Sequence, residues 1–246
     1  MLSLHNLSVR LDGKDILKEV SLTLRPHRLT ALVGRNGSGK STLMLLLDKL
    51  YPLEEGKGTI TVGGTDIRKI RTAHLRKNIG FVLQEPYLFS RTIAENIAIS
   101  NDEIDMLAVR SAAEAAALDE TVNGFAAGYE TMVGERGVTL SGGQKQRAAI
   151  ARTLVSQTPI LIFDDSLSAV DTETDARIRR AISQRFGKAT VILISHRITT
   201  LSAADKIIVL DKGRITEEGT HEELKNAGGI YQKIYEAQSG AGEVLM

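Results

Sequence analysis

The chain has 246 residues, and its 31 Lys and Arg side chains nearly balance its 30 Asp and Glu side chains, for a formal net charge of +1. This balance, with no run of basic residues, argues against a nucleic-acid partner, and the absence of cysteine excludes disulfides, thiolate zinc sites and cysteine nucleophiles. No apolar run approaches the roughly 20 residues of a membrane span and the N-terminus does not resemble a signal peptide, so any role at a membrane is expected outside the bilayer.

The front of the chain is expected to contain an antiparallel β region. Alternation of apolar and polar residues predicts strands at 2–9 and 20–24, and Pro26 ends the second of them. A fully apolar strand is predicted at 29–33, and an exposed strand closed by two glycines at 59–62.

The rest of the chain has the pattern of an α/β fold with a helical insertion. Residues 86–158 are poor in strand patterns and include an alanine-rich helical stretch at 107–118. Short apolar runs then predict strands of a parallel sheet buried on both faces, at 160–163, 191–194 and 207–210. The predicted parts are 1–85 with the β region and the start of the core, 86–158 with the helices, 159–237 with the rest of the core, and a flexible tail at 238–246.

The strongest chemical signal is a phosphate-binding loop of the pattern G-x-x-x-x-G-K-[ST], which follows the strand at 29–33 and precedes a helical run at 42–50. The backbone N–H groups of such a loop form an anion site, and glycine is needed where the backbone turns around phosphate oxygens. Lys40 would reach the β- and γ-phosphates, and the Ser41 hydroxyl would bind Mg²⁺. A chance glycine-rich turn is the alternative, and the strand and helix on either side disfavour it. The residues predicted to bind nucleotide here are Gly34, Arg35, Asn36, Gly37, Ser38, Gly39, Lys40, Ser41 and Thr42.

A second signal is the apolar strand at 160–163, which is followed by Asp164 and Asp165. A carboxylate at the end of such a strand can hold the Mg²⁺ of a bound nucleotide, which assigns Asp164 to the metal. Asp165 stands where a water-polarising carboxylate belongs. The alternative is a turn that ends the strand and caps the next helix, and the phosphate-binding loop upstream favours the metal role.

A third signal separates this chain from many other P-loop proteins. Ser141 is a natural N-cap for a helix whose apolar face includes positions within 150–155. Gly142 and Gly143 follow in the first turn, where each costs roughly 1 kcal/mol relative to Ala. Close approach of another group explains these glycines better than a simple capped helix does. This helix end, which includes Gln144, is therefore predicted to bind phosphate.

On these motifs the sequence resembles the nucleotide-binding domains of ABC transporters, over residues 2–237. The resemblance implies a P-loop NTPase (RecA-like) core with a parallel sheet, an antiparallel β subdomain and a helical subdomain, which together form the ABC ATPase fold. It makes 34–42 the Walker A motif and 160–164 the Walker B motif. It makes 140–144 the signature, which serves the nucleotide site of a partner chain.

The resemblance also assigns roles to further residues. Gln84 matches the Q-loop glutamine, which contacts Mg²⁺ and senses the γ-phosphate, and His196 matches the switch histidine. The implied catalytic residues are Lys40, Gln84, Asp165 and His196, and the implied metal ligands are Ser41, Gln84 and Asp164. The D-loop would include Ser168 and Asp171. The trans site would consist of Ser141, Gly142, Gly143 and Gln144. The residues that bind nucleotide would also include Leu11 and Ile16.

Two stretches, 88–97 and 133–137, look like the coupling segments of exporter-type members of this family. In that group the second stretch faces the transmembrane domains, which gives Glu135 and Arg136 a coupling role. The alternative for this pair is a surface ion pair, which contributes little to stability.

Two positions depart from the family pattern. Asp165 replaces the usual Glu, which draws the carboxylate back by more than about 1 Å, and a misplacement of that size can cost about a hundredfold in rate. In heterodimeric exporters this substitution marks the site that hydrolyses ATP poorly. Leu11 occupies the adenine-stacking position, where an aromatic residue is usual, so weaker contact with the base is expected.

The resemblance implies ATP and Mg²⁺ as ligands and ATP-dependent pairing with a second nucleotide-binding domain, identical or not. It implies attachment to the transmembrane domains of an ABC exporter, at the cytoplasmic face of the cell membrane. The alternatives are a non-transport ABC ATPase, for which a coiled-coil interruption or tandem cassettes are expected, and a regulatory nucleotide-binding module with little turnover. These motifs do not indicate the transported substrate.

Overall fold

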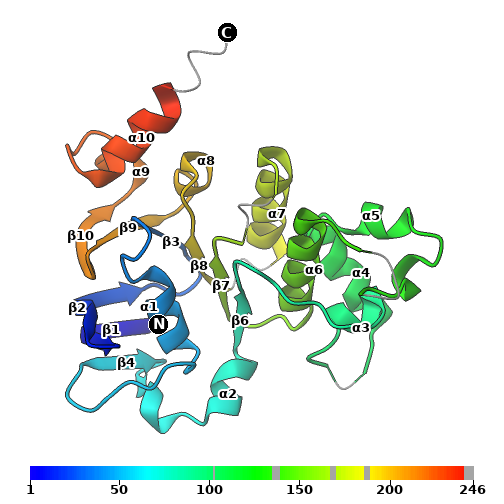
Figure 1. Ribbon diagram of the computed structural model, residues 1–246, viewed down its shortest axis with the longest axis horizontal. Helices are drawn as coiled ribbons and strands as arrows, with labels where there is room; N and C mark the ends of the chain where they lie inside the picture. The colour runs from blue at the N-terminus through cyan, green and yellow to red at the C-terminus, as the bar shows by residue number, and fades with distance from the viewer. Residues whose placement is uncertain (102, 135–138, 167–169, 186–188, 241–246) are drawn as a thin grey trace. The chain divides into compact units, whose positions relative to one another are not determined.

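The computed structural model describes residues 1–101, 103–134, 139–166, 170–185 and 189–240 (Figure 1). The chain forms two compact units. The first unit combines Met1–Ile79 with Lys188–Met246, and the second consists of Gly80–Gly187. The predicted helical segment 86–158 lies within the second unit, which also contains the strand and helix that follow it.

An antiparallel sheet of order β2-β1-β4-β5 forms the front of the first unit. Strands β1 (Leu2–Leu11) and β2 (Lys14–Leu24) are joined by the Asp12-Gly13 turn, whose φ angles of +48° and +77° suit a tight hairpin. Strand β4 (Thr59–Val62) pairs with β1, and β5 (Thr65–Asp66) is the short edge. The predicted strands at 2–9, 20–24 and 59–62 are confirmed, but β2 begins six residues earlier than predicted. Its first half is largely exposed and does not show the alternation of a half-buried strand.

The second sheet of this unit has the order β10-β9-β3-β8. Strand β3 (Leu29–Val33) lies between β8 (Thr190–Ile194) and β9 (Lys206–Asp211) and is parallel to both. The parallel core strands predicted from apolar runs are thus present. Strand β10 (Arg214–Gly219) is antiparallel to β9 and was not predicted, because it is an edge strand with every second side chain exposed.

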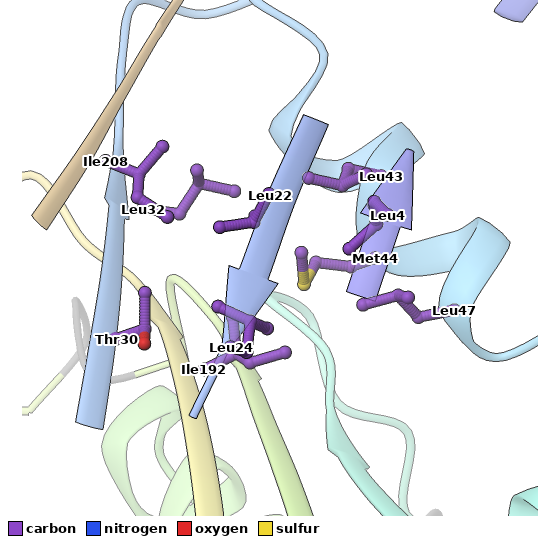
Figure 2. A pocket seen from close by; sticks show the side chains of 10 residues that line it. All are labelled: Leu4, Leu22, Leu24, Thr30, Leu32, Leu43, Met44, Leu47, Ile192 and Ile208. Atoms are coloured by element: carbon purple, nitrogen blue, oxygen red, sulfur yellow. The ribbon is translucent and has the colours of Figure 1, made fainter. Parts of the chain in front are cut away.

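Helix α1 (Lys40–Leu47) packs over the interior of the first unit. Figure 2 shows side chains of β1, β2, β3, β8, β9 and α1 converging on one cavity. The volume of this cavity is about 10 Å³. All of the lining residues except Thr30 are apolar, so this space is a packing defect of the core and offers a polar ligand no partners. The lining residues are Leu4, Leu22, Leu24, Thr30, Leu32, Leu43, Met44, Leu47, Ile192 and Ile208.

The remaining helices of the first unit are short, apart from the last. They are η1 (Ile67–Lys69), α2 (Thr72–Lys77), α8 (Ile198–Leu201), α9 (His221–Leu224) and α10 (Ile230–Gly240). Tyr231 of α10 is fully buried in a core cluster with Ala31, Val33 and Val209 of the sheet. Because α10 continues to Gly240, residues 238–240 are helical, whereas the sequence predicted a tail from 238; residues 241–246 lie outside the described part.

The second unit is mainly helical. Its strands β6 (Ile79–Val82) and β7 (Ile160–Asp164) are neighbours. Its helices are α3 (Ile93–Ile97), α4 (Met106–Ala115), α5 (Asp119–Asn123), η2 (Gly128–Glu130), α6 (Gly142–Val155) and α7 (Thr172–Arg185). Helix α4 packs against α6. Among the residues that the structure describes, no helix is both long and apolar enough to cross a membrane.

Candidate nucleotide-binding site

The phosphate-binding loop curls around the side chain of its own lysine. Lys40 is only 7% exposed, and its Nζ donates hydrogen bonds to the carbonyl oxygens of Gly34 (2.6 Å) and Arg35 (3.0 Å). The loop is closed by a bond from the Ser38 N–H to the Arg35 carbonyl (3.1 Å). A buried ammonium held by carbonyl groups at a helix start is a preformed partner for phosphate oxygens.

The loop packs against β2 of one sheet and β9 of the other, and these contacts explain its glycines. Gly39 has φ of +104°, and a Cβ there would lie 2.6 Å from Leu17 Cδ2 and 3.0 Å from the Ile16 carbonyl. A Cβ on Gly34 would collide with the Leu210 carbonyl. No side chain fits at either position, so the backbone is free to approach a ligand closely on its other side.

Other residues predicted for this site lie in β1, in β2 and at the start of α1. Ile16 lies beside Gly39, as the contact above shows, and is half-buried. Leu11 is half-buried at the end of β1, opposite Lys14. The side chain of Ser41 is exposed and that of Thr42 is half-buried at the start of α1, and the exposed tip of the loop consists of Arg35, Asn36 and Gly37.

His196 is placed at the same edge of the sheet as the loop. In the parallel pairing of β3 with β8, Leu32 lies opposite Ile194, and Gly34 and His196 each come two residues later. The backbone after β8 is held by a bond from the Arg197 N–H to Ser195 Oγ (3.1 Å). His196 is half-buried there.

Gln238 contacts this histidine segment and was not predicted from the sequence. Its Nε2 donates to the His196 carbonyl (2.6 Å), and its Oε1 accepts from the Ile198 N–H (2.9 Å). The sequence offers little signal for this contact, because a lone glutamine more than 40 residues away is not distinguished from a surface residue.

In the second unit, the start of α6 has the predicted cap. Ser141 Oγ accepts from the Gln144 N–H (3.3 Å), and Gln144 Oε1 accepts from the Ser141 N–H (2.9 Å), which is a capping box. Ser141 and Gly142 are exposed. A Cβ on Gly142 would meet no atom of the described chain within 4 Å, so this helix end is open.

Helix α6 also holds the Q-loop. Gln146 is 3% exposed, and its Nε2 donates to the main-chain carbonyl of Gln84 (2.5 Å). The side chain of Gln84 is itself exposed. Gln146 was not among the predicted site residues, although a glutamine on the apolar face of a helix is a recognisable signal for a buried polar contact.

The two aspartates at the end of β7 differ in their backbone. Asp164 is the last residue of the strand and is 7% exposed. Asp165 is half-buried and has φ of +44°, in the left-handed region that Asp adopts more readily than most residues. Asp171, of the predicted D-loop, accepts the Thr174 N–H at Oδ1 (2.9 Å), which holds the pKa of its carboxyl below the usual value.

Three predicted residues, Ser168, Glu135 and Arg136, lie outside the described part of the chain. Of the predicted metal ligands, Ser41 belongs to the first unit, and Gln84 and Asp164 belong to the second. The described residues contain no group of three or more His, Asp or Glu side chains that could hold a metal by themselves. An oxygen-only set of few protein ligands nevertheless suits Mg²⁺, which takes one or two carboxylates together with substrate phosphates.

An exposed aromatic pair lies within and beside the predicted coupling segment 88–97. Tyr87 is 70% and Phe89 43% exposed, and their rings meet edge to face at 5.1 Å. Arg152 of α6 donates to the Tyr87 carbonyl (2.8 Å) and lies over the Phe89 ring. The buried Asn96 side chain accepts from the Phe89 N–H and donates to its carbonyl, both at 2.9 Å. A rigid network therefore supports an exposed apolar surface.

Comparison with known proteins identifies the family. Residues 17–168 match the family model described as ABC transporter. The chain is 42% identical over 240 residues to the ATP-dependent lipid A-core flippase of Aromatoleum aromaticum, covering 96% of this chain and 40% of the flippase. It is also 42% identical over 228 residues to the mitochondrial potassium channel ATP-binding subunit of Homo sapiens, covering 92% of this chain and 31% of that protein.

A solved structure of a bacterial Atm1-family ABC exporter with ATP bound matches with a TM-score of 0.92 and 39% identity, over 97% of this chain and 42% of the exporter chain. The chain thus spans less than half the length of each of these relatives. The fold class predicted from the sequence, an ABC ATPase fold of the α/β class, is confirmed. The chain belongs to the ABC transporter family and carries its ATP-binding domain.

Proposed function

We propose that the chain binds and hydrolyses ATP as the nucleotide-binding domain of an ABC exporter. The observation that carries this proposal is the presence of two unlike helix ends in one chain. The start of α1 is a closed phosphate cradle around the buried Lys40, and the start of α6 is an open, glycine-tipped end. Such a chain holds one nucleotide itself and offers the second end to another molecule.

Lys40, Ser41, Gln84 and Asp164 would hold the nucleotide and its Mg²⁺. The lysine ammonium would exchange its carbonyl partners for phosphate oxygens, which carry more negative charge. The Ser41 hydroxyl, the Gln84 side chain and the Asp164 carboxylate supply oxygen donors of the kind that Mg²⁺ prefers. When bound, the metal ion would neutralise charge on the phosphates.

A second nucleotide-binding domain is the proposed partner of α6. The capping box occupies the N–H groups of Ser141 and Gln144, while the exposed Gly142 leaves the first turn of the helix accessible to an anion, which the helix dipole favours. A nucleotide held by a second copy or a homologous chain would supply that anion. Pairing is then driven by ATP, because each site is half-built in each chain.

Transmembrane domains of an exporter are the proposed partner of the aromatic pair Tyr87 and Phe89. Large exposed apolar side chains with a supporting network mark protein contact sites, and Leu83 of the same unit is a further exposed apolar residue, at 47%. On this proposal the chain lies at the cytoplasmic face of a membrane. The cargo stays undefined, because relatives of equal identity are named for lipid A-core and for a potassium channel.

Turnover at the chain's own site is expected to be low because Asp165 is short. This observation favours a second candidate function, the nucleotide-sensing half of a heterodimer in which the partner's site does most of the hydrolysis. The two candidates differ in the ATPase rate of the purified chain and agree on ATP binding and pairing.

Sedimentation velocity with and without Mg²⁺ and ATP tests the proposal. We expect a monomer without nucleotide and a dimer with it. Gly142→Asp places a carboxylate at the open helix end and should keep the chain monomeric while ATP binding persists. Gly240→Asp, at an equally open helical glycine of α10, is the matched control and should dimerise normally. A tight dimer without nucleotide, or normal pairing of Gly142→Asp, contradicts the proposed role.

A further inference from the structure

Helix α8, which begins just after the switch histidine, lacks a cap of its own. Its N-cap position is Arg197, whose side chain makes no capping bond, and Arg is a poor residue for that position. The first N–H of the helix, that of Ile198, instead donates to Oε1 of Gln238 on α10 (2.9 Å). The amide of Gln238 therefore replaces the missing cap.

The same amide also holds the histidine backbone. Nε2 of Gln238 donates to the His196 carbonyl (2.6 Å). One planar side-chain amide thus bonds to the carbonyl of one residue and to the N–H two residues later, as a neighbouring strand would. The peptide groups on the C-terminal side of His196 are fixed by this contact, and the Ser195 Oγ bond to the Arg197 N–H fixes the segment between them.

Helix α10 is itself anchored to the core, so it can present Gln238 at a defined place. The Glu217 carboxylate of β10 accepts the N–H groups of Ile230 (2.5 Å) and Tyr231 (3.3 Å). The Tyr231 hydroxyl is 2.7 Å from Nδ1 of His221 in α9, and its ring is fully buried against the sheet. Gln238 follows Tyr231 by two helical turns, about 10 Å along the axis.

We propose that Gln238 is a positioning residue that fixes the backbone of the switch histidine for ATP hydrolysis. This inference rests on the proposed ATPase function. Without the amide, the carbonyl of His196 and the N–H of Ile198 turn to solvent, and the histidine ring samples more positions. The phosphate-binding loop does not involve α10, so nucleotide binding is unaffected while the catalytic step slows.

Gln238→Met is the test variant, because it keeps the length of the side chain and the helix propensity and removes both hydrogen bonds. Gln232→Met is the matched control on the same helix, since Gln232 bonds only to Gly228 and Glu236 of its own segment among the interactions seen. Steady-state ATPase should show kcat lowered about tenfold for Gln238→Met, with KM for ATP unchanged. Gln232→Met should retain the wild-type kcat.

A double variant distinguishes positioning from a general loss of structure. In a His196→Ala background, Gln238→Met should cause no further loss of kcat, because the residue acts through the histidine. Gln238→Glu keeps the acceptor for Ile198 and loses the donor to His196, so its kcat should fall as well. Melting temperatures of all variants identify any that fail to fold at the assay temperature.

Two results would overturn the inference and leave the ATPase function standing. One is a wild-type kcat in Gln238→Met when His196→Ala is impaired, and the other is an equal loss from Gln238→Met with and without His196. If the wild-type chain showed no ATP turnover that depends on His196, the proposed ATPase function would be overturned. The positioning role of Gln238 would fall with it.

Discussion

The starts of α1 and α6 are both glycine-bearing helix ends, but they are built in opposite ways. At α1, the buried Lys40 fills the loop, and Gly39 has no room for a side chain. At α6, Ser141 and Gln144 cap each other, and Gly142 has open space around the position of a Cβ among the described residues.

The difference shows that glycine serves two purposes in this chain. At position 39 the protein's own packing and a φ of +104° require it. At position 142 no contact within the described chain requires it, which fits the proposed approach of a partner's nucleotide. The first helix end is closed by contacts within its own chain, and the second is the end that we propose binds the nucleotide of a partner chain.

The largest expected effect comes from removing the lysine of the closed end. Lys40→Ala should weaken Mg²⁺-ATP binding by about 10- to 100-fold, because charge-assisted hydrogen bonds contribute roughly 1.5–3 kcal/mol. Lys145→Ala removes the same charge near the start of α6 and should leave the affinity of the isolated chain unchanged. Calorimetric titration measures both, and equal losses would show that the two ends do not differ as described.

The two glycines themselves provide the most direct comparison. Gly39→Ala should lower the free energy of unfolding by about 1–3 kcal/mol, because Ala is strained at positive φ and would meet Leu17. Gly142→Ala should raise it by about 0.5–1 kcal/mol, because Ala favours a helix and fills open space. Urea denaturation of both variants measures the two changes in the free energy of unfolding. Changes of the same sign would remove the distinction.

Substitutions of Asp165 test whether the chain's own nucleotide site hydrolyses ATP at the full rate. Asp165→Glu should raise turnover about tenfold by extending the carboxylate, and it should lower the melting temperature because Glu tolerates φ of +44° less well than Asp. Asp165→Asn should abolish residual hydrolysis and favour the ATP-bound dimer. The three proteins are compared in steady-state ATPase assays with the same partner, and a wild-type rate equal to that of the Glu variant would show that Asp165 is a competent base.

The smallest expected effect concerns the cap of the open end. Ser141→Ala should lower the free energy of unfolding by about 1 kcal/mol at every pH, because its partner Gln144 is neutral.

In the same unit, the Thr92 N–H donates to Glu95 (2.8 Å) and holds the pKa of that carboxyl below its usual value of 4.5. A carboxyl whose pKa is lowered in the folded state stabilises the fold above pH 4.5. This contribution to the free energy of unfolding is lost as the pH falls through the lowered pKa.

Denaturation of both cap variants between pH 7 and 3 therefore separates the two caps. The effect of Glu95→Ala, which removes the carboxylate that accepts the Thr92 N–H, should shrink in acid, whereas that of Ser141→Ala should persist. If the effects of both variants shrink together, acid destabilises the whole second unit. The pH dependence then does not distinguish the two caps.

Strands that are almost wholly buried, or that alternate regularly, were predictable, whereas two exposed edge segments were missed. The runs in β3, β7, β8 and β9 are almost wholly buried, and their apolar residues stand out in the sequence. The first half of β2 and all of β10 lie at exposed edges, where polar side chains are tolerated. A tail from 238 was predicted because residues 238–240, which form the exposed end of α10, are small or polar.

The sequence alone determined the lysine at the start of α1, the Asp pair at the end of β7 and the capped start of α6, because each depends on residues close together in the chain. Local spacing is enough to place a lysine at a helix start or a serine at a cap. Only the tertiary structure decided which distant residues hold these segments. Gln146 reaches Gln84 across 62 positions and Gln238 reaches His196 across 42, and such contacts leave no periodic signal because folding alone brings these residues together.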